Sequence, residues 1–434
     1  MAGNRKRIEA DTVISEAKEL LTLSAKNGSG ELGLIRTGTV AGKNGNIVAV
    51  GESSLLDNEI LLSKKGKWID AKGKLVMPGF VDCHTHALFA GSREKEFSMR
   101  LRGASYMEIR EKGYGIRESV RQFKNASDNE IRTSTLKRLE RMLIHGTTSV
   151  EIKSGYGLSF DDELRALRLI REVGELSIIT VVATFLGAHD VPQDFEGRTG
   201  SYVELITQDL IPEVAKRGLA QFCDVFCEEG VFSVDESRTV LLEGIRHNLK
   251  PKLHADEFSD SGGALLAAEV SAVSADHLMC TGRAGMEKLL SAGVIPVLLP
   301  ACSFSLGKGK YANGREMADI GLPVALATDL NPGSSMCESM QMVISLACVG
   351  VGLTPEEAIV GATRNAGHAA GLGREVGTLE PGKKFDCIIL DVPSFEYIPY
   401  HFGGNHVIHT IKDGKVVASY GRLEKGEGAH EKAR

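Results

Sequence analysis

The sequence has no apolar run approaching the roughly 20 residues that a membrane-spanning helix requires, so we expect no membrane partner. The basic start, Met1–Arg7, is not followed by an apolar signal core, and we therefore expect a cytoplasmic protein. The eight cysteines are scattered and form no Cys-x-x-Cys pair. In a chain of this size, such cysteines are typical of reduced, buried thiols and not of a disulfide framework.

Blocks of positive charge are also missing. The formal net charge is −6 and no cluster of lysine and arginine stands out, which argues against nucleic acid as a partner. A small molecule can be the substrate and the chain can form a homodimer; the composition does not decide either point. Hydrophobic residues make up 42% of the 434 residues, an ordinary globular balance that allows a full-sized core. This length is typical of a large barrel with an appendage.

Apolar runs alternate with amphipathic helical stretches through the middle of the chain. Eight runs have the composition of buried strands: 80–83, 147–152, 178–186, 223–226, 251–254, 272–277, 294–299 and 324–329. Helical stretches between most of them cover 129–144, 161–173, 210–217, 237–247, 262–269 and 284–291. Eight such β–α alternations over about 250 residues predict an α/β fold, a (β/α)8 TIM barrel, in residues 77–376.

Short β-type segments occupy both ends of the chain. The turn sequence in residues 412–417 resembles that in residues 42–48, and each places Asp-Gly or Asn-Gly beside strand-like residues. Residues 16–21 fit a strand or a helical turn, and we leave that assignment open. We predict a small β-sandwich domain built from both termini, residues 1–76 and 377–434, beside the barrel.

Two histidines follow the first barrel strand, one residue apart. Residues i and i+2 of a strand point to the same side, so His84 and His86 can direct two imidazoles at one point. A strand end with this pattern supplies half of a metal site. Other ligands have to come from the remaining strand ends, because active sites of such barrels lie at the carboxyl ends of the strands.

The other strand ends supply these groups. His254 follows the fifth strand and Asp329 follows the eighth, so His84, His86, His254 and Asp329 form a predicted metal site. Three nitrogens and one carboxylate suit Zn2+ or iron, Fe2+ or Fe3+, with a position left for water. Such a cation lowers the pKa of bound water toward about 7. We expect one metal ion, because the fourth strand ends without the lysine that bridges two metals in related barrels.

Three residues are candidates for the proton transfers. Asp329 can accept a proton from water, His277 can orient the water or stabilise an oxyanion, and Glu257 can carry a proton to a leaving nitrogen. Which of them is the main proton carrier stays open at this stage.

The stretch Pro78–His86, the later single histidine and the late aspartate resemble the metal-dependent amidohydrolase superfamily. More specific stretches, residues 84–93, 151–158, 184–189, 274–277 and 327–335, are similar to the imidazolonepropionase family. The resemblance covers about residues 8–418. It implies hydrolytic ring opening of 4-imidazolone-5-propanoate to N-formimidoyl-L-glutamate, a step of histidine degradation, by a metal-activated water.

The resemblance also implies roles for residues around the metal. Arg93 is expected to clamp the propanoate carboxylate, because a guanidinium is a rigid fork of donors. The remaining substrate-binding candidates are Tyr106, Tyr156, His189, Glu257, Asn331, Gly333 and Ser334. Backbone N–H groups and the hydroxyl of the turn Asn331–Ser334 are candidate donors to the propanoate or the product. Glu257-Phe258 departs from the family, where many members have Gln-Leu at this point.

Two other functions compete with this interpretation. A guanine or cytosine deaminase of the same superfamily would use a similar metal site, but its nucleobase has no carboxylate for Arg93 to bind. A catalytically inactive scaffold barrel is the alternative from another class. Such proteins usually lose metal ligands, whereas this chain keeps all four.

Overall fold

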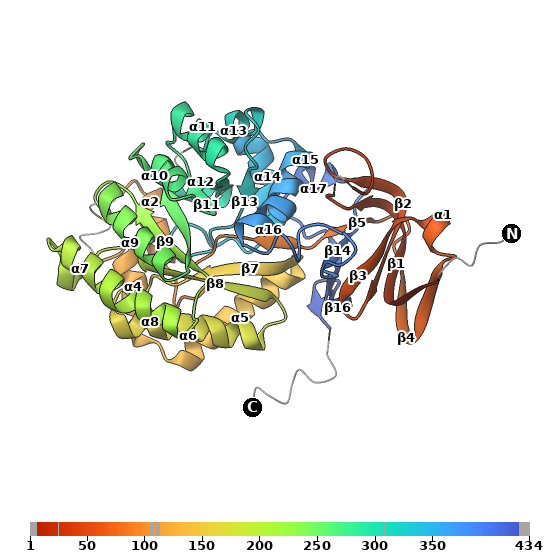
Figure 1. Ribbon diagram of the computed structural model, residues 1–434, viewed down its shortest axis with the longest axis horizontal. Coiled ribbons are helices and arrows are strands. Elements are labelled where there is room, and N and C mark those ends of the chain that lie inside the picture. The colour runs from red at the N-terminus through yellow and green to blue at the C-terminus, as the bar shows by residue number, and fades with distance from the viewer. Residues whose placement is uncertain (1–6, 25, 105–107, 109–112, 308, 425–434) are drawn as a thin grey trace.

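The computed structural model describes residues 7–24, 26–104, 108, 113–307 and 309–424. Eight parallel strands form one sheet in the order of the chain and curve into a barrel (Figure 1). They are β6 (Phe80–Asp82), β7 (Thr147–Lys153), β8 (Thr180–Ala188), β9 (Phe222–Cys227), β10 (Lys250–Ala255), β11 (Ser274–His277), β12 (Ile295–Leu298) and β13 (Ala325–Leu326). Each lies within or beside one of the eight apolar runs, so the predicted fold class is confirmed.

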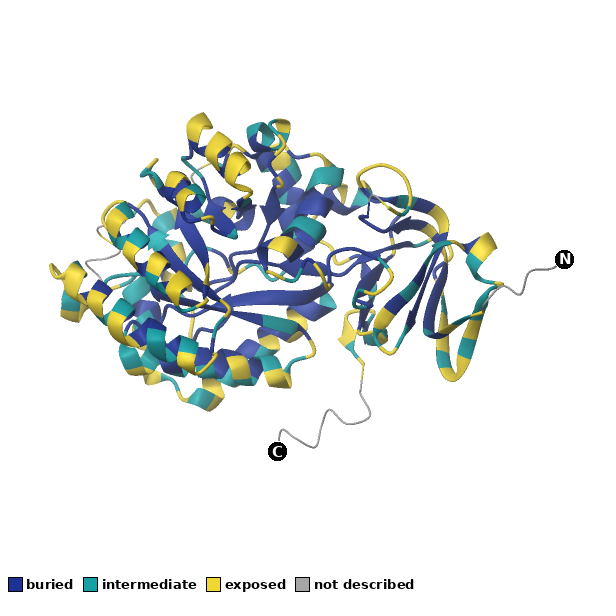
Figure 2. Ribbon diagram, viewed as in Figure 1, coloured by how far each residue is buried: buried dark blue, intermediate teal, exposed yellow. Residues whose placement is uncertain are grey.

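Helices pack around the outside of this barrel. The longer ones are α4 (Ile116–Asn125), α5 (Asp128–Ile144), α6 (Phe160–Leu176), α9 (Val234–Arg246) and α11 (Arg283–Ala292). The shorter ones are α2 (Glu94–Leu101), α7 (Thr199–Leu205), α8 (Ile211–Lys216), α10 (Gly263–Glu269), α12 (Pro300–Leu306), α13 (Gly314–Asp319), α14 (Met340–Leu346), α15 (Pro355–Val360) and α16 (Ala366–Ala369). Figure 2 shows buried residues on the faces toward the strands and exposed residues on the outer faces.

The sequence itself marks where several helices begin. Ser127 caps α5 by accepting from the N–H of Glu130, whose carboxylate in turn accepts from the N–H of Ser127. Ser233 and Glu236 form the same capping box at the start of α9. Such reciprocal bonds satisfy backbone donors that have no partner within the helix, and they fix the point where each helix begins.

The barrel closes between its first and last strands. The segment after β6 and the segment after β13 form a parallel bridge at Thr85 and Leu330. The N–H of Asp329 donates to the carbonyl of His84 (3.1 Å), and the N–H of His86 donates to the carbonyl of Leu330 (2.9 Å). Residues predicted as metal ligands therefore lie on both sides of this seam.

A second sheet of nine strands lies beside the barrel, at the right of Figure 1. Its strand order is β17-β16-β15-β14-β5-β1-β2-β3, with β4 paired to β1. The strands are β1 (Ile8–Leu21), β2 (Leu34–Lys43), β3 (Asn46–Glu52), β4 (Ile60–Asp70), β5 (Leu75–Pro78), β14 (Cys387–Leu390), β15 (Val407–Lys412), β16 (Lys415–Ser419) and β17 (Arg422–Leu423). Residues 16–21, left open from the sequence, belong to strand β1.

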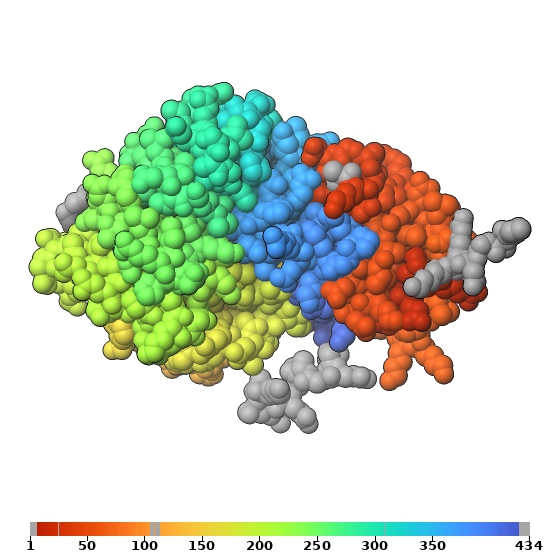
Figure 3. Space-filling view, viewed as in Figure 1, coloured from red at the N-terminus to blue at the C-terminus, as the bar shows by residue number. Residues whose placement is uncertain are grey.

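Two tight turns bring the ends of the chain together in this sheet. Asn44-Gly45 joins β2 to β3 and Asp413-Gly414 joins β15 to β16, and all four residues have positive φ angles. Paired left-handed residues are the geometry that a two-residue hairpin favours, which explains the recurring Asn-Gly and Asp-Gly pattern. The N–H of Phe385 donates to the carbonyl of Gly45 (2.8 Å), and the N–H of Gly414 donates to that of Phe385 (2.9 Å). The N-terminal and C-terminal parts are adjacent in Figure 3. The division of the chain into domains at residues 76/77 and 376/377 stays a prediction.

All eight cysteines are free thiols, and five of them are buried. Across the residues that the structure describes, no helix has both the length and the apolar character that crossing a bilayer requires.

Candidate active site

Four side chains meet at the carboxyl ends of β6, β10 and β13. The Nε2 atoms of His86 and His254 lie 3.4 Å apart. The Oδ1 atom of Asp329 lies 3.5 Å from Nε2 of His84 and 3.7 Å from Nε2 of His86. All four residues are buried. Nitrogen and oxygen donors from neighbouring strand ends thus gather inside the barrel, in two overlapping groups that could each hold a metal ion: His84, His86 and Asp329, and His84, His254 and His277.

These separations fit a bound cation. Two ligand bonds of about 2.1 Å at a tetrahedral angle place their ligand atoms about 3.4 Å apart, close to the distances observed here. Among the described residues, Nε2 of His84 is buried without a hydrogen-bond partner. A buried polar atom without a partner is costly, and a metal ion would remove that cost. The donor set therefore fits a divalent metal ion.

The electrostatics of the site favour the ligating forms of the histidines. Burial, together with nearby cationic groups, holds the pKa values of His84 and His86 well below the usual range. A neutral imidazole keeps the lone pair that a metal requires. Burial also raises the pKa of Asp329 to about 7. A cation beside this carboxylate would favour its ionised form.

The backbone is strained at the same end of the barrel. Asp256, His277, Leu278 and Asp329 all have φ angles between 52° and 74°. Non-glycine residues rarely adopt this left-handed conformation, and such strain gathers at functional sites.

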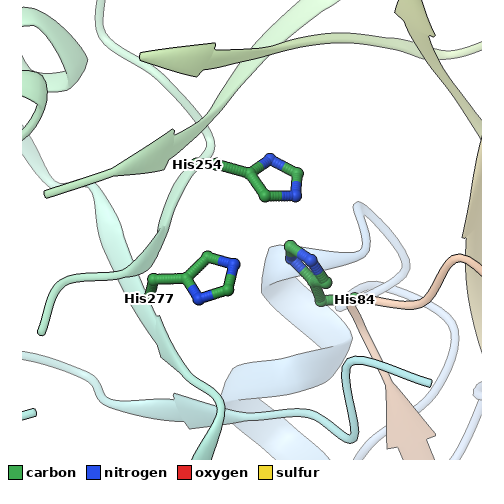
Figure 4. A group of neighbouring side chains, drawn as sticks. All are labelled: His84, His254 and His277. Atoms are coloured by element: carbon green, nitrogen blue, oxygen red, sulfur yellow. The ribbon is translucent and has the colours of Figure 1, made fainter. Parts of the chain in front are cut away.

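His277 and Glu257 lie beside the four donors. The Nδ1 atom of His277 lies 3.7 Å from a carboxylate oxygen of Glu257. The three imidazoles of His84, His254 and His277 point toward one another from three different strand ends (Figure 4). His277 is therefore close to the donors on one side and to an acid–base group on the other.

A cavity of about 540 Å³ opens above the donors. Its lining includes His86, Arg93, Tyr156, His189, Glu257, His277, Asp329, Asn331, Gly333 and Ser334. The predicted substrate-binding residues thus lie around one cavity, apart from Tyr106, which lies outside the described residues. Their assignment to substrate stays a prediction.

Two aromatic side chains form one wall of this cavity. The His189 ring stacks on His86 with centroids 4.8 Å apart. Nδ1 of His189 lies 3.0 Å from the carbonyl of Gly155, so it carries the proton, and Nε2 remains an acceptor. Burial lowers the pKa of His189 to about 3 and keeps this ring neutral. Burial also raises the pKa of Tyr156 above its usual value, so its hydroxyl stays a donor.

The predicted carboxylate clamp is partly engaged within the protein. Arg93 donates from Nε and Nη2 to both oxygens of Glu96, each at 2.8 Å. Arg100 donates from Nη1 to Glu96 and to the carbonyl of Gly333, each at 3.1 Å. Nη2 of Arg100 is buried and has no hydrogen-bond partner within the described part of the chain. Glu96 and Arg100 also line the cavity, and the sequence interpretation did not include them.

The hydrogen bonds made by the turn after β13 differ from those expected from the sequence. The N–H groups of Gly333 and Ser334 donate to the side-chain oxygen of Asn331, at 2.8 and 2.7 Å. Both N–H groups are therefore engaged within the turn, and the expectation that they bind a carboxylate stays a prediction. The turn also contacts the two arginines: the Gly333 carbonyl accepts from Arg100, and the Arg93 guanidinium occupies the space where a Cβ of residue 333 would stand.

Comparison with known proteins gives the family. The family model described as "Amidohydrolase family" matches residues 252–417. Imidazolonepropionase of Geobacillus kaustophilus is 46% identical over 418 residues, covering 94% of this chain and 98% of that protein. Imidazolonepropionase of Brevibacillus brevis is 44% identical over 422 residues, covering 94% and 98%.

A solved structure shares the fold at much lower identity. An adenosine deaminase from Xanthomonas campestris with bound zinc superposes with a TM-score of 0.73 and 16% identity, covering 98% of this chain and 96% of that one. That likeness concerns the fold alone. The identity to the two imidazolonepropionases, over nearly the whole length of each protein, is decisive: the chain belongs to the imidazolonepropionase family of amidohydrolases.

Proposed function

We propose that the cavity binds 4-imidazolone-5-propanoate and that the chain hydrolyses it to N-formimidoyl-L-glutamate, with one divalent cation on His84, His86, His254 and Asp329. One observation carries the assignment: two arginines, Arg93 and Arg100, line the same cavity as three of the four converging donors. The substrate has a ring carbonyl to be attacked and a carboxylate to be bound. The relatives named imidazolonepropionase support the same reaction.

The bound cation supplies a water of lowered pKa and polarises the ring carbonyl. The reaction adds this water across the ring C–N bond, so its oxygen enters a new carboxylate and the ring nitrogen leaves with a proton. Asp329 accepts a proton from the water. Glu257 delivers a proton to the leaving nitrogen. His277, whose Nδ1 lies 3.7 Å from Glu257, carries its single proton on Nε2 and donates it toward the developing oxyanion.

The remaining residues hold the substrate in place. Neutral His189 and the Tyr156 hydroxyl hydrogen-bond the ring, one as acceptor and the other as donor. The outer nitrogens of Arg93 and Arg100 bind the propanoate, and the turn Asn331–Ser334 supports these arginines. Charge-assisted bonds of this kind contribute more than neutral ones. They also disfavour a nucleobase, which has no carboxylate, so we prefer this reaction to deamination of guanine or cytosine.

Zn2+ and iron both suit three imidazoles and one carboxylate. We propose a cytoplasmic enzyme whose partner is this small molecule, with no nucleic-acid partner; a homodimer remains a prediction.

One assay tests the proposal. We expect metal-loaded protein to consume 4-imidazolone-5-propanoate, followed by its ultraviolet absorbance, and Asp329→Ala to abolish turnover. Arg93→Ala should raise KM. No loss of substrate with the wild-type, metal-loaded protein would exclude the assignment, whereas an unchanged KM for Arg93→Ala would exclude only the clamp.

A further inference from the structure

Five charged side chains lie inside the barrel, directly below the ligand histidines. They are Glu151 and Lys153 of β7, Asp224 of β9, Lys252 of β10 and Asp276 of β11, and each is fully buried. We call these five residues the buried charge cluster. Buried charges are costly to desolvate, so they persist only where hydrogen bonds and opposite charges surround them.

Two carboxylates of the cluster contact the ligand histidines. Oδ2 of Asp276 lies 2.6 Å from Nδ1 of His84. Oδ1 of Asp224 lies 3.1 Å from Nδ1 of His254. An ionised carboxylate only accepts, so each histidine carries its proton on Nδ1 and presents the lone pair of Nε2 to the metal.

One ammonium group joins these two carboxylates. Nζ of Lys153 lies 2.6 Å from Oδ2 of Asp224, 3.4 Å from Oδ2 of Asp276 and 3.1 Å from Oε1 of Glu151. The three contacts match the three N–H donors of lysine. Asp224 thus lies between Lys153 and His254 through its two oxygens, and Asp276 uses one oxygen for both Lys153 and His84.

We propose that Lys153 is a positioning residue that fixes two ligand histidines at once, through Asp224 and Asp276. Lys153 is not itself one of the four proposed metal donors. It sets the orientation of both carboxylates, and they set the ring orientation and tautomer of His84 and His254. Partners behind metal-bound histidines commonly change metal affinity by about 10- to 100-fold when they are removed.

The chain provides a matched control in Lys252. This lysine is equally buried, and it donates to Glu151 (2.8 Å) and to the carbonyl of Cys83 (3.4 Å). Among the described residues its hydrogen bonds do not include Asp224 or Asp276. Removing Lys252 removes a buried ion pair of the same kind but takes no hydrogen bond away from Asp224 or Asp276.

The test compares Lys153→Met with Lys252→Met. Folding is first checked by circular dichroism and thermal unfolding. The affinity for Zn2+ is then measured by competition with a chromophoric chelator, and Co2+-loaded protein reports the ligand geometry through its visible d–d bands. We expect Lys153→Met to weaken Zn2+ binding at least tenfold and to shift the Co2+ bands. Lys252→Met should change the affinity less than threefold and leave the bands in place.

A double variant separates positioning from general destabilisation. If Lys153 acts through Asp224, adding Lys153→Met to Asp224→Asn should weaken Zn2+ binding much less than it does in the wild type. Equal effects in both backgrounds, or equal effects of the two lysine variants, would overturn the inference. If Lys153→Met does not fold, Lys153→Gln replaces it, and the single variants Asp224→Asn and Asp276→Asn must each weaken Zn2+ binding or the inference fails.

The inference rests on the proposed metal site but not on the proposed substrate. Wild-type protein that binds none of Zn2+, Co2+ and Fe2+ would exclude the metal site itself. Tight wild-type binding that Lys153→Met leaves unchanged would exclude only the role of Lys153.

Discussion

Arg93 binds both carboxylate oxygens of Glu96 with one edge of its guanidinium, through Nε and Nη2. Its third nitrogen, Nη1, lies beside Gly333, where a Cβ atom would approach it to 2.2 Å. Glu96 therefore fixes the direction of the guanidinium, and the nitrogen that remains faces the turn after the last barrel strand. Because Nε and Nη2 bind Glu96, Arg93 does not offer two free nitrogens to a substrate carboxylate. A second arginine, Arg100, is therefore needed to bind it.

Substitution of either arginine should affect substrate binding more than turnover. A lost hydrogen bond to a charged group costs about 2 kcal/mol, which corresponds to roughly a 30-fold rise in KM. We expect Arg93→Ala and Arg100→Met each to raise KM for 4-imidazolone-5-propanoate by about that factor, with kcat changed less than fivefold. Arg102→Ala, at an exposed position just beyond α2, is the matched control and should leave both constants unchanged. An Arg100→Met variant with wild-type KM would remove Arg100 from the clamp.

Glu96 should contribute to stability in a pH-dependent way. Burial would raise its pKa, but hydrogen bonds and charge from Arg93, the Gly115 N–H and Arg100 outweigh burial and hold the pKa below the usual 4.5. A carboxyl whose pKa is lowered in the folded state stabilises the fold above the unfolded pKa, and this contribution is lost as the pH falls through the folded pKa. We expect Glu96→Gln to lose about 2 kcal/mol of unfolding free energy at pH 7.

This difference should shrink as the pH falls below about 4.5. Urea unfolding of both proteins at a series of pH values measures it. A difference that stays constant between pH 7 and pH 3 would show that Glu96 acts by packing and not by charge.

Gly333→Ala tests the contact between the turn and Arg93 directly. The added methyl group would displace the Arg93 guanidinium, because its Nη1 and Cζ atoms lie within 2.5 Å of the Cβ position. We expect KM to rise about tenfold, equivalent to about 1.4 kcal/mol, with little change in kcat or thermal stability. Gly200→Ala, where a Cβ meets no atom within 4 Å, is the control. Unchanged KM in Gly333→Ala would mean that the position of Arg93 is not critical.

Metal removal should loosen the barrel at its seam. His84, His86 and Asp329 lie on the two segments that close it, so a cation bound there links the first and last strands. A ligand present at a thousand times its Kd stabilises the folded state by about 4 kcal/mol. We expect chelation to lower the thermal midpoint and to increase amide exchange in peptides covering residues 84–86 and 328–331.

The hairpin of β2 and β3, in the other sheet, serves as the internal reference for this measurement. It should exchange at the same rate with and without metal. Equal increases in both regions would indicate global loosening and would contradict a local link at the seam.

The barrel and the clustering of polar side chains at its carboxyl end could be predicted because their signals are local. Buried parallel strands give continuous apolar runs, and the residue that follows each run lies at the functional end. This rule identified His254 and Asp329 without any knowledge of the three-dimensional contacts. Residues 16–21 were ambiguous because Glu16–Leu21 is rich in helix-forming residues, whereas pairing with β2 and β5 makes them a strand.

The supporting charges could not be assigned in the same way. Asp224 and Lys252 interrupt apolar runs, and charged residues inside buried strands are a signal that could have pointed to an internal network. Which acid meets which base depends on how the strands face across the barrel, and periodicity does not contain that information. The contact between Arg100 of α2 and the Gly333 carbonyl likewise joins segments far apart in the sequence.

The position of the site at this seam also determines when the site can form during synthesis of the chain. A ribosome releases His84 and His86 early and Asp329 only after all the other barrel strands, so a growing chain carries an incomplete donor set for most of its translation. β5, which leads directly into β6, can pair with β1 early, but its other edge must wait for β14. Binding of the proposed cation by all four donors would therefore be a late event of biogenesis, and a chain that ends before residue 329 would lack one of the four.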